Sequence, residues 1–115
     1  MIQFIYYPKC STCMKALKHL KEKELSFQSR DIVLETPTKE ELKQWIERKN
    51  EGIKPFFNTA GQVYKTLKLK DKINELSIDE AVELLSTYGM LIKRPLLVLD
   101  NQIILGYKKE IYEKL

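Results

Sequence analysis

Two cysteines, Cys10 and Cys13, constrain this sequence more than any other feature, because they are its only cysteines and lie close together. The run from Ile2 to Tyr7 before them is β-branched and aromatic, which predicts a buried strand. From Ser11 to about Glu24, apolar residues recur at three- and four-residue spacing, which predicts a helix. The pair therefore lies where a strand ends and a helix begins.

A second extended segment is predicted over residues 25–33. Thr38 and Glu41 then form a capping box, so a helix should start there and end near Gly52, a natural C-terminal glycine. One short helix is expected within residues 58–69, around Tyr64 and Leu67.

The last third of the chain repeats the capping pattern at Ser77 and Glu80, which predicts a helix ending before Gly89. Apolar runs over residues 95–99 and 103–105 flank a turn at residues 100–102, and a short helix should begin at about residue 108. The tight turn makes this last pair of strands antiparallel.

The predicted order is strand-helix-strand, a helical insertion over about residues 36–90, then strand-strand-helix. The first half requires a parallel pair with a right-handed crossover helix. Joining the halves predicts an α/β fold with a four-stranded mixed sheet, the thioredoxin or glutaredoxin arrangement, in one domain over residues 1–115.

Composition bounds the class of protein. The 115 residues are 43% hydrophobic and 31% charged, a globular balance. No secretory signal or membrane span is recognisable, so we expect a cytoplasmic protein in which a Cys-x-x-Cys pair is held as thiols. The net charge of +4 comes from lysines spread along helical segments, which argues against direct binding of nucleic acid.

At a helix start, the Cys10 sulfur would face unpaired amide groups and the positive end of the helix dipole, which favours the thiolate. Lys9 adds to this effect, and Ser11 and Thr12 offer backbone amides to an anion. Cys13 lies one turn further in and should be more protected. We therefore expect Cys10 to attack and Cys13 to resolve the mixed disulfide.

Two alternatives remain open at this stage. The pair could be half of a zinc site, but such a site takes four ligands and the chain offers only His19 besides the two cysteines. The cysteines could also be small buried apolar residues without chemistry. The first alternative is the weaker, and no metal ligand is assigned.

Several segments together resemble the arsenate reductases of the glutaredoxin-like class and their relatives, the Spx-type transcriptional regulators. The resemblance covers essentially the whole chain. Its carriers are Tyr7-Pro8-Lys9-Cys10-Ser11-Thr12-Cys13, Phe56-Phe57-Asn58-Thr59-Ala60-Gly61 leading to Tyr64, and Gly89-Met90-Leu91-Ile92-Lys93-Arg94-Pro95-Leu96 followed by Gly106-Tyr107.

The resemblance to the reductases implies that the cysteine nucleophile attacks an oxidised substrate and that Arg94 stabilises an anion or the thiolate. Pro95 would be a cis proline facing the cysteines. No bound cofactor is implied, and the electrons would come from thioredoxin, glutaredoxin or glutathione. Where the reductases carry a further arginine this chain has Asn58, which, with Lys93, could contribute to binding a small oxyanion or disulfide substrate.

A cysteine at position 13, where the reductases usually have serine, is the Spx-type pattern. Those regulators bind the C-terminal domain of the RNA polymerase α subunit, and Gly52 matches a glycine of their contact surface. A plain helix cap explains Gly52 equally well. Three hypotheses follow: a thiol-dependent reductase, a redox-sensing regulator, or a scaffold that has lost its chemistry.

Overall fold

The computed structural model describes residues 2–115, and its centre is a four-stranded sheet in the order β2-β1-β3-β4. The central strand β1 (Ile2–Tyr6) pairs in parallel with β2 (Phe27–Asp31). On its other side it pairs antiparallel with β3 (Leu96–Val98), which pairs antiparallel with β4 (Ile103–Leu105). The predicted mixed sheet and the direction of its strands are confirmed.

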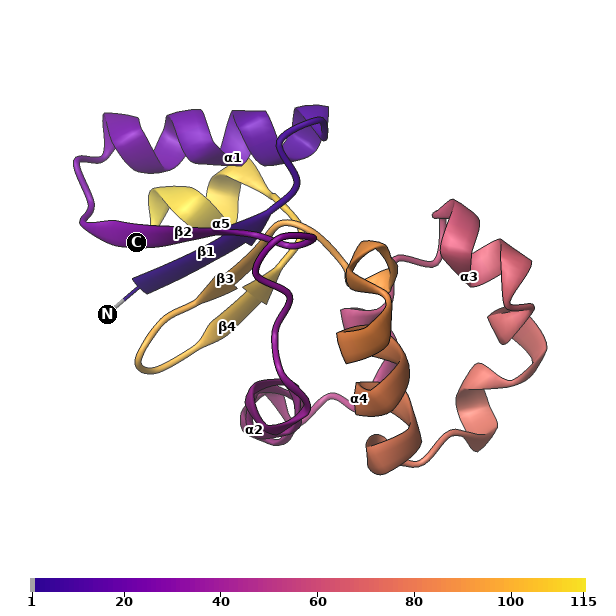
Figure 1. The fold of residues 1–115 in the computed structure, drawn as a ribbon. Coiled ribbons are helices and arrows are strands. Elements are labelled where there is room, and N and C mark those ends of the chain that lie inside the picture. Colours follow the sequence, from indigo (N-terminus) through magenta and orange to yellow (C-terminus); the bar gives the residue numbers. More distant parts are fainter. Residues whose placement is uncertain (1) are drawn as a thin grey trace.

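Two helices cover one face of the sheet (Figure 1). They are α1 (Ser11–Glu22) and α5 (Lys109–Glu113). Because side chains alternate along a strand, Phe4, Leu97 and Ile104 share this face and pack with Ala16, Leu20 and Tyr112. The predicted spacing in α1 is confirmed, since its buried residues are Cys13, Ala16 and Leu20.

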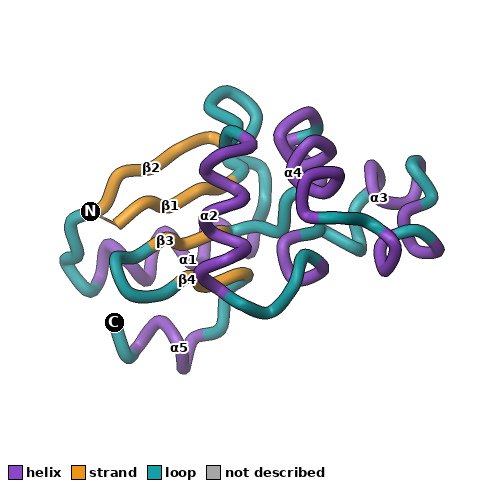
Figure 2. The backbone as a smooth tube through the Cα atoms, turned by 90° about the horizontal axis from the view of Figure 1, so that it is seen from below, coloured by secondary structure: helices purple, strands orange, loops and turns teal. Residues whose placement is uncertain are grey.

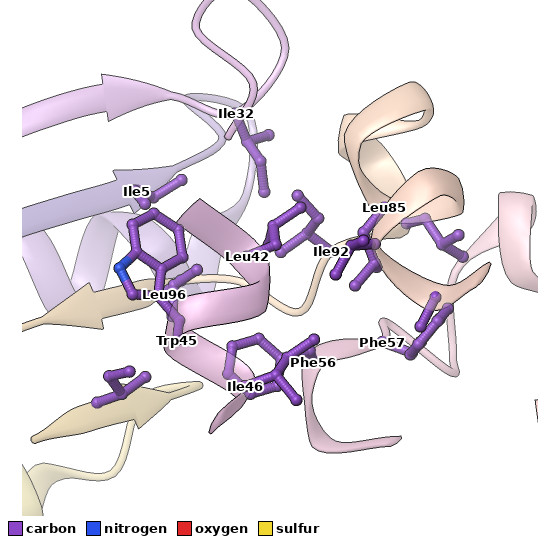
Figure 3. Packing of buried hydrophobic residues seen from close by; sticks show 14 of the residues in the cluster. Ile5, Ile32, Leu42, Trp45, Ile46, Phe56, Phe57, Leu85, Ile92 and Leu96 are labelled. Atoms are coloured by element: carbon purple, nitrogen blue, oxygen red, sulfur yellow. The ribbon is translucent and has the colours of Figure 1, made fainter. Parts of the chain in front are cut away.

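The opposite face is covered by α2 (Lys39–Lys49), as Figure 2 shows from below. Here Ile5 and Leu96 of the sheet meet Trp45 and Ile46 of the helix (Figure 3). This apolar cluster continues past the sheet to Phe57, so it also holds the helical segment between β2 and β3 against the rest of the fold. Burial of large apolar side chains is the main stabilising contribution here.

The segment between β2 and β3 contains the three helices expected there and, in addition, four short 3₁₀ turns. Beyond α2 these are η1 (Lys54–Phe56), α3 (Gln62–Thr66), η2 (Leu69–Asp71), η3 (Ile73–Glu75), α4 (Ile78–Thr87) and η4 (Gly89–Leu91). The helix expected around Tyr64 is α3, but the four 3₁₀ turns were not predicted. A turn of three residues is too short to show an apolar period.

Both predicted capping boxes are present. Thr38 and Glu41 bond reciprocally at the start of α2, and Ser77 and Glu80 do so at the start of α4. The prediction of Gly52 as the C-terminal cap of α2 is wrong, because the helix ends at Lys49 and its C-cap is Asn50, which adopts the left-handed conformation with φ 54°. Asparagine tolerates this conformation better than most residues.

The residues from 2 to 115 contain no helix that is long and apolar enough to cross a bilayer.

Candidate active site

The reactive end of α1 is built by the loop that leaves β1, at the end of the sheet where the chain also enters β3 (Figure 1). Cys10 is the N-cap of α1, with extended backbone angles of φ −97° and ψ 116°. Its N–H donates to the carbonyl of Tyr7 at 3.0 Å, and its carbonyl accepts the first helical bond from Met14 at 3.1 Å. The sulfur therefore stands at the start of a twelve-residue helix, as the sequence predicts.

The surroundings of Cys10 favour its thiolate. Partial burial alone would raise the pKa of the Cys10 thiol, but several groups outweigh it. The backbone N–H and the thiol of Cys13 point to the sulfur, and the guanidinium of Arg94 adds hydrogen-bonding capacity and positive charge. The net result is a pKa of Cys10 below its ordinary value.

Cys13 has the opposite tendency. Its side chain is fully buried, and this burial, together with the charge of Cys10, raises the pKa of Cys13 to about 12, although the backbone N–H of Tyr7 works against the rise. Both cysteines are free thiols in this structure. The pair thus divides into a Cys10 whose thiolate is favoured and a Cys13 that stays protonated at neutral pH.

Arg94 lies next to this pair and is fixed from two sides. One guanidinium nitrogen, Nη1, donates to the carbonyl of Met90 at 3.0 Å, and the guanidinium carbon lies 5.4 Å from the ring centroid of Tyr7. The peptide bond between Arg94 and Pro95 is cis, as the family resemblance implied. Cys10 and Cys13 at the start of α1 are therefore brought together with Arg94, which lies just before β3.

Three other predicted residues adjoin Cys10 or Arg94 in the chain. Ser11 and Thr12 are exposed in the first turn of α1, and Pro95 is buried. Asn58 is half-buried, and its N–H donates to the carbonyl of Leu91 at 2.7 Å, which ties its segment to the residues that precede Arg94.

The last two predicted residues are Lys93 and Gly52. Lys93 is exposed, and its Cε lies 3.3 Å from the point where a Cβ on Gly106 would stand, so its side chain runs over that glycine. Gly52 lies after α2 with φ 78°, and no atom within 4 Å would meet a Cβ placed there. Gly52 is thus an open loop position and not the helix cap.

Sequence analysis missed Tyr7 and Met90 as neighbours of Arg94. The contact of Tyr7 depends on the register of β1 and β3, which pair with Ile5 opposite Leu96, so that the same register continued by two residues sets Tyr7 opposite Arg94. This register appears only in the assembled sheet. The contribution of Met90 is a backbone carbonyl, which any residue could supply. No side-chain pattern reveals such a contact.

Across residues 2–115, no group of three or more histidine, cysteine, aspartate or glutamate side chains is arranged to hold a metal ion. The site as described consists of two sulfur atoms, one guanidinium and the backbone N–H groups at the start of α1. Such a set can carry out thiol chemistry on an oxidised or anionic substrate.

The chain is similar over most of its length to several known proteins. The chain is 42% identical over 113 residues to the uncharacterized protein YusI of Bacillus subtilis, covering 98% of this chain and 96% of YusI. It is 37% identical over 106 residues to the regulatory protein MgsR of the same organism, covering 92% of this chain and 82% of MgsR. The global transcriptional regulator Spx of Streptococcus agalactiae is 28% identical over 110 residues, or 96% of this chain and 79% of Spx.

A solved structure from Streptococcus mutans UA159, described as that of a possible arsenate reductase, superposes with a TM-score of 0.90. It is 43% identical to this chain, and the match covers 98% of both chains. The family model described as "ArsC family" matches residues 5–115, which include the two cysteines, Arg94 and the whole of the helical segment. The chain therefore belongs to the ArsC family of thiol redox proteins, which has Spx-type regulators among its relatives.

Proposed function

We propose that this protein is a thiol-dependent oxidoreductase in which Cys10 is the nucleophile and Cys13 the resolving thiol. The observation that carries the proposal is the lowered pKa of Cys10 directly beside a buried, protonated Cys13. An unperturbed Cys10 would have suggested a scaffold without chemistry, so its lowered pKa counts against that hypothesis.

With arsenate as the oxidised substrate, the Cys10 thiolate attacks arsenic(V), and an oxygen leaves as water after protonation. Cys13 then loses its proton and attacks the Cys10 sulfur. The disulfide forms as the sulfur–arsenic bond breaks, and that electron pair stays on arsenic, which departs as arsenite. Two thiols have lost two electrons, and an external thiol reductant such as thioredoxin, glutaredoxin or glutathione returns them.

Binding of the anion falls to Arg94 and to the free N–H groups of Ser11 and Thr12 at the start of α1. Asn58 and Lys93 are further candidates for contact with the substrate. The chain has only three arginines, and asparagine stands where the reductases have one more, so the oxyanion is held less tightly than by a full set of guanidinium groups. Another oxidised substrate, such as a disulfide, fits the same thiol pair.

The test is arsenite formation by the reduced protein, supplied in parallel with thioredoxin and its reductase or with glutathione and glutaredoxin. We expect turnover by the wild type and none by Cys10→Ser. Cys13→Ser should lose the thioredoxin-supported rate, because the mixed disulfide then has no internal partner. A wild-type rate no higher than that of Cys10→Ser, with arsenate and with a disulfide substrate, would contradict the proposal.

A second candidate is a redox-sensing regulator that binds the C-terminal domain of the RNA polymerase α subunit. It is supported by the identity to MgsR and Spx and by the open position of Gly52. A pull-down of this domain, with the protein reduced and oxidised, tests it. Gly52→Arg should abolish capture, while Glu22→Arg, at an exposed position of α1 on the opposite face of the sheet, should not. No capture in either redox state would remove the candidate.

A further inference from the structure

Tyr7 contacts every member of the candidate active site. Its carbonyl accepts the N–H of Cys10 at 3.0 Å, and its own N–H favours the charged form of Cys13. Its ring lies 5.4 Å from the guanidinium carbon of Arg94. Only the last contact depends on the side chain, so a substitution at Tyr7 can remove it while both backbone contacts stay.

We propose that the ring of Tyr7 is the positioning element of the site, a cation–π platform that, together with the carbonyl of Met90, holds the Arg94 guanidinium beside the Cys10 sulfur. The inference rests on the roles proposed above for Cys10 and Arg94. A free arginine side chain has many rotamers, and ordering it is unfavourable in entropy. The ring supports one face of the planar group and Met90 takes one of its five N–H donors, so the remaining donors stay available to the thiolate or a bound anion.

The fold explains why position 7 can do this. Side chains alternate along β1 and on into Tyr7, which directly follows it, so Ile5 and Tyr7 face the α2 side of the sheet while Phe4 and Tyr6 face α1. Tyr6 stacks on Phe4 at 5.3 Å and belongs to the other apolar cluster. Tyr6 is therefore a matched control, with the same side chain one residue earlier and on the opposite face of the sheet.

The alkylation rate of Cys10 indicates whether the Arg94 guanidinium lies beside its sulfur. In the reduced protein, the Cys10 thiolate displaces iodide from iodoacetate, which is an anion, or from iodoacetamide, which is neutral. The rate with iodoacetate divided by the rate with iodoacetamide measures the positive charge held near the sulfur. Both rates are followed by mass spectrometry of the Cys10 peptide. Cys13 is fully buried and mostly protonated, so it contributes little.

We expect Tyr7→Phe to keep the wild-type ratio, because the ring remains. Tyr7→Leu should lower the ratio about three- to tenfold, the size of a partly desolvated cation–π contact. It should also raise the pKa of Cys10, measured by thiolate absorbance. Tyr6→Leu should change neither quantity.

If Tyr7 acts through Arg94, the effects of substituting the two residues should be coupled. In an Arg94→Gln background, Tyr7→Leu should have no further effect on the ratio, since the group that it positions is gone. Equal losses with and without Arg94, an unchanged ratio in Tyr7→Leu, or the same loss in Tyr7→Phe would each overturn the inference. If circular dichroism shows that Tyr7→Leu is unfolded, Tyr7→Met keeps the apolar volume without a ring and replaces it.

The alkylation test is independent of turnover. If the wild type reduces neither arsenate nor a disulfide, but the alkylation ratio is lower in Tyr7→Leu than in the wild type, the proposed function is contradicted and the inference about Tyr7 is supported. If the wild type is catalytically active and the ratio is the same in Tyr7→Leu, the proposed function is supported and the inference is contradicted.

Discussion

The starts of helices α1 and α2 differ in how their backbone N–H groups are satisfied. α2 begins with Thr38, whose hydroxyl accepts from the N–H of Glu41 at 3.1 Å while the Glu41 carboxylate accepts from Thr38 at 3.0 Å. α1 begins with Cys10, whose side chain makes no capping bond of the kind that oxygen side chains make, and its first turn holds no acidic residue. α4 resembles α2, with a full capping box at Ser77.

The difference shows which helix start serves stability and which serves chemistry. In α2 and α4 the orphan N–H groups and the positive end of the dipole are matched by the helix's own oxygen atoms. In α1 the same groups are left to the Cys10 sulfur, and they stabilise its negative charge. A strong cap on α1 would therefore compete with the thiolate.

The largest expected effect on stability is at the α2 start. Glu41 holds the cap and also forms a bidentate pair with Arg30, with oxygen–nitrogen distances of 2.8 and 3.1 Å. The Arg30 side chain is only 15% exposed, so Glu41→Ala leaves a largely buried cation without its carboxylate. We expect a loss of about 2–3 kcal/mol in the free energy of unfolding, measured by urea denaturation.

Glu80→Ala is the matched control, because Glu80 caps α4 in the same way but forms no ion pair within residues 2–115. It should lose only about 0.5–1 kcal/mol. The Arg30 guanidinium is the main group that lowers the pKa of Glu41. The stabilisation by the ionised Glu41 is thus complete above the ordinary carboxyl pKa and is lost as pH falls through the lowered value. The free energies of unfolding of wild type and Glu41→Gln should therefore converge in acid.

Equal losses of stability in Glu41→Ala and Glu80→Ala would refute the assigned role of Arg30.

A smaller effect of the opposite sign is expected at the α1 start. Cys10→Asp supplies the missing oxygen cap and an anion at the positive end of the helix dipole, next to Arg94. The variant should be about 0.5–1 kcal/mol more stable than Cys10→Ala in urea, although both lack the nucleophile. If Cys10→Asp is no more stable than Cys10→Ala, the N–H groups at this helix start are not available as described.

Most of the fold could be predicted because its signals are local and periodic. The strand predicted from the β-branched and aromatic run around Phe4, the three- and four-residue spacing in α1 and both capping boxes appear in the structure as expected. The errors lie where no period exists. Asn50 and not Gly52 is the C-cap of α2, although both residues have a positive φ. Either residue can adopt the left-handed conformation, so the place of the cap depends on where the helix stops packing.

In the candidate site, too, the features with local sequence signals could be predicted and those that depend on the assembled fold could not. The positions of Cys10 and Cys13 follow from a strand that meets a helix, which the sequence shows directly. The support of Arg94 by Tyr7 and by the Met90 carbonyl depends on strand pairing between residues about 87 positions apart, and on a backbone atom that has no sequence signature. Pairing register is a property of the assembled sheet, so sequence analysis could name the arginine but not what holds it.

The smallest expected effect separates charge from capping at α1. Ser11→Asp places an exposed carboxylate in the first turn, where it favours the helix slightly but repels the Cys10 thiolate. The pKa of Cys10 should rise, and its alkylation by iodoacetate at neutral pH should slow about two- to fivefold, the range of a solvent-screened charge pair. Ser11→Asn has nearly the same shape without the charge and should react at the wild-type rate. A slowing of the same size in Ser11→Asn would mean that the shape of the first turn, and not its electrostatic potential, controls the reactive sulfur.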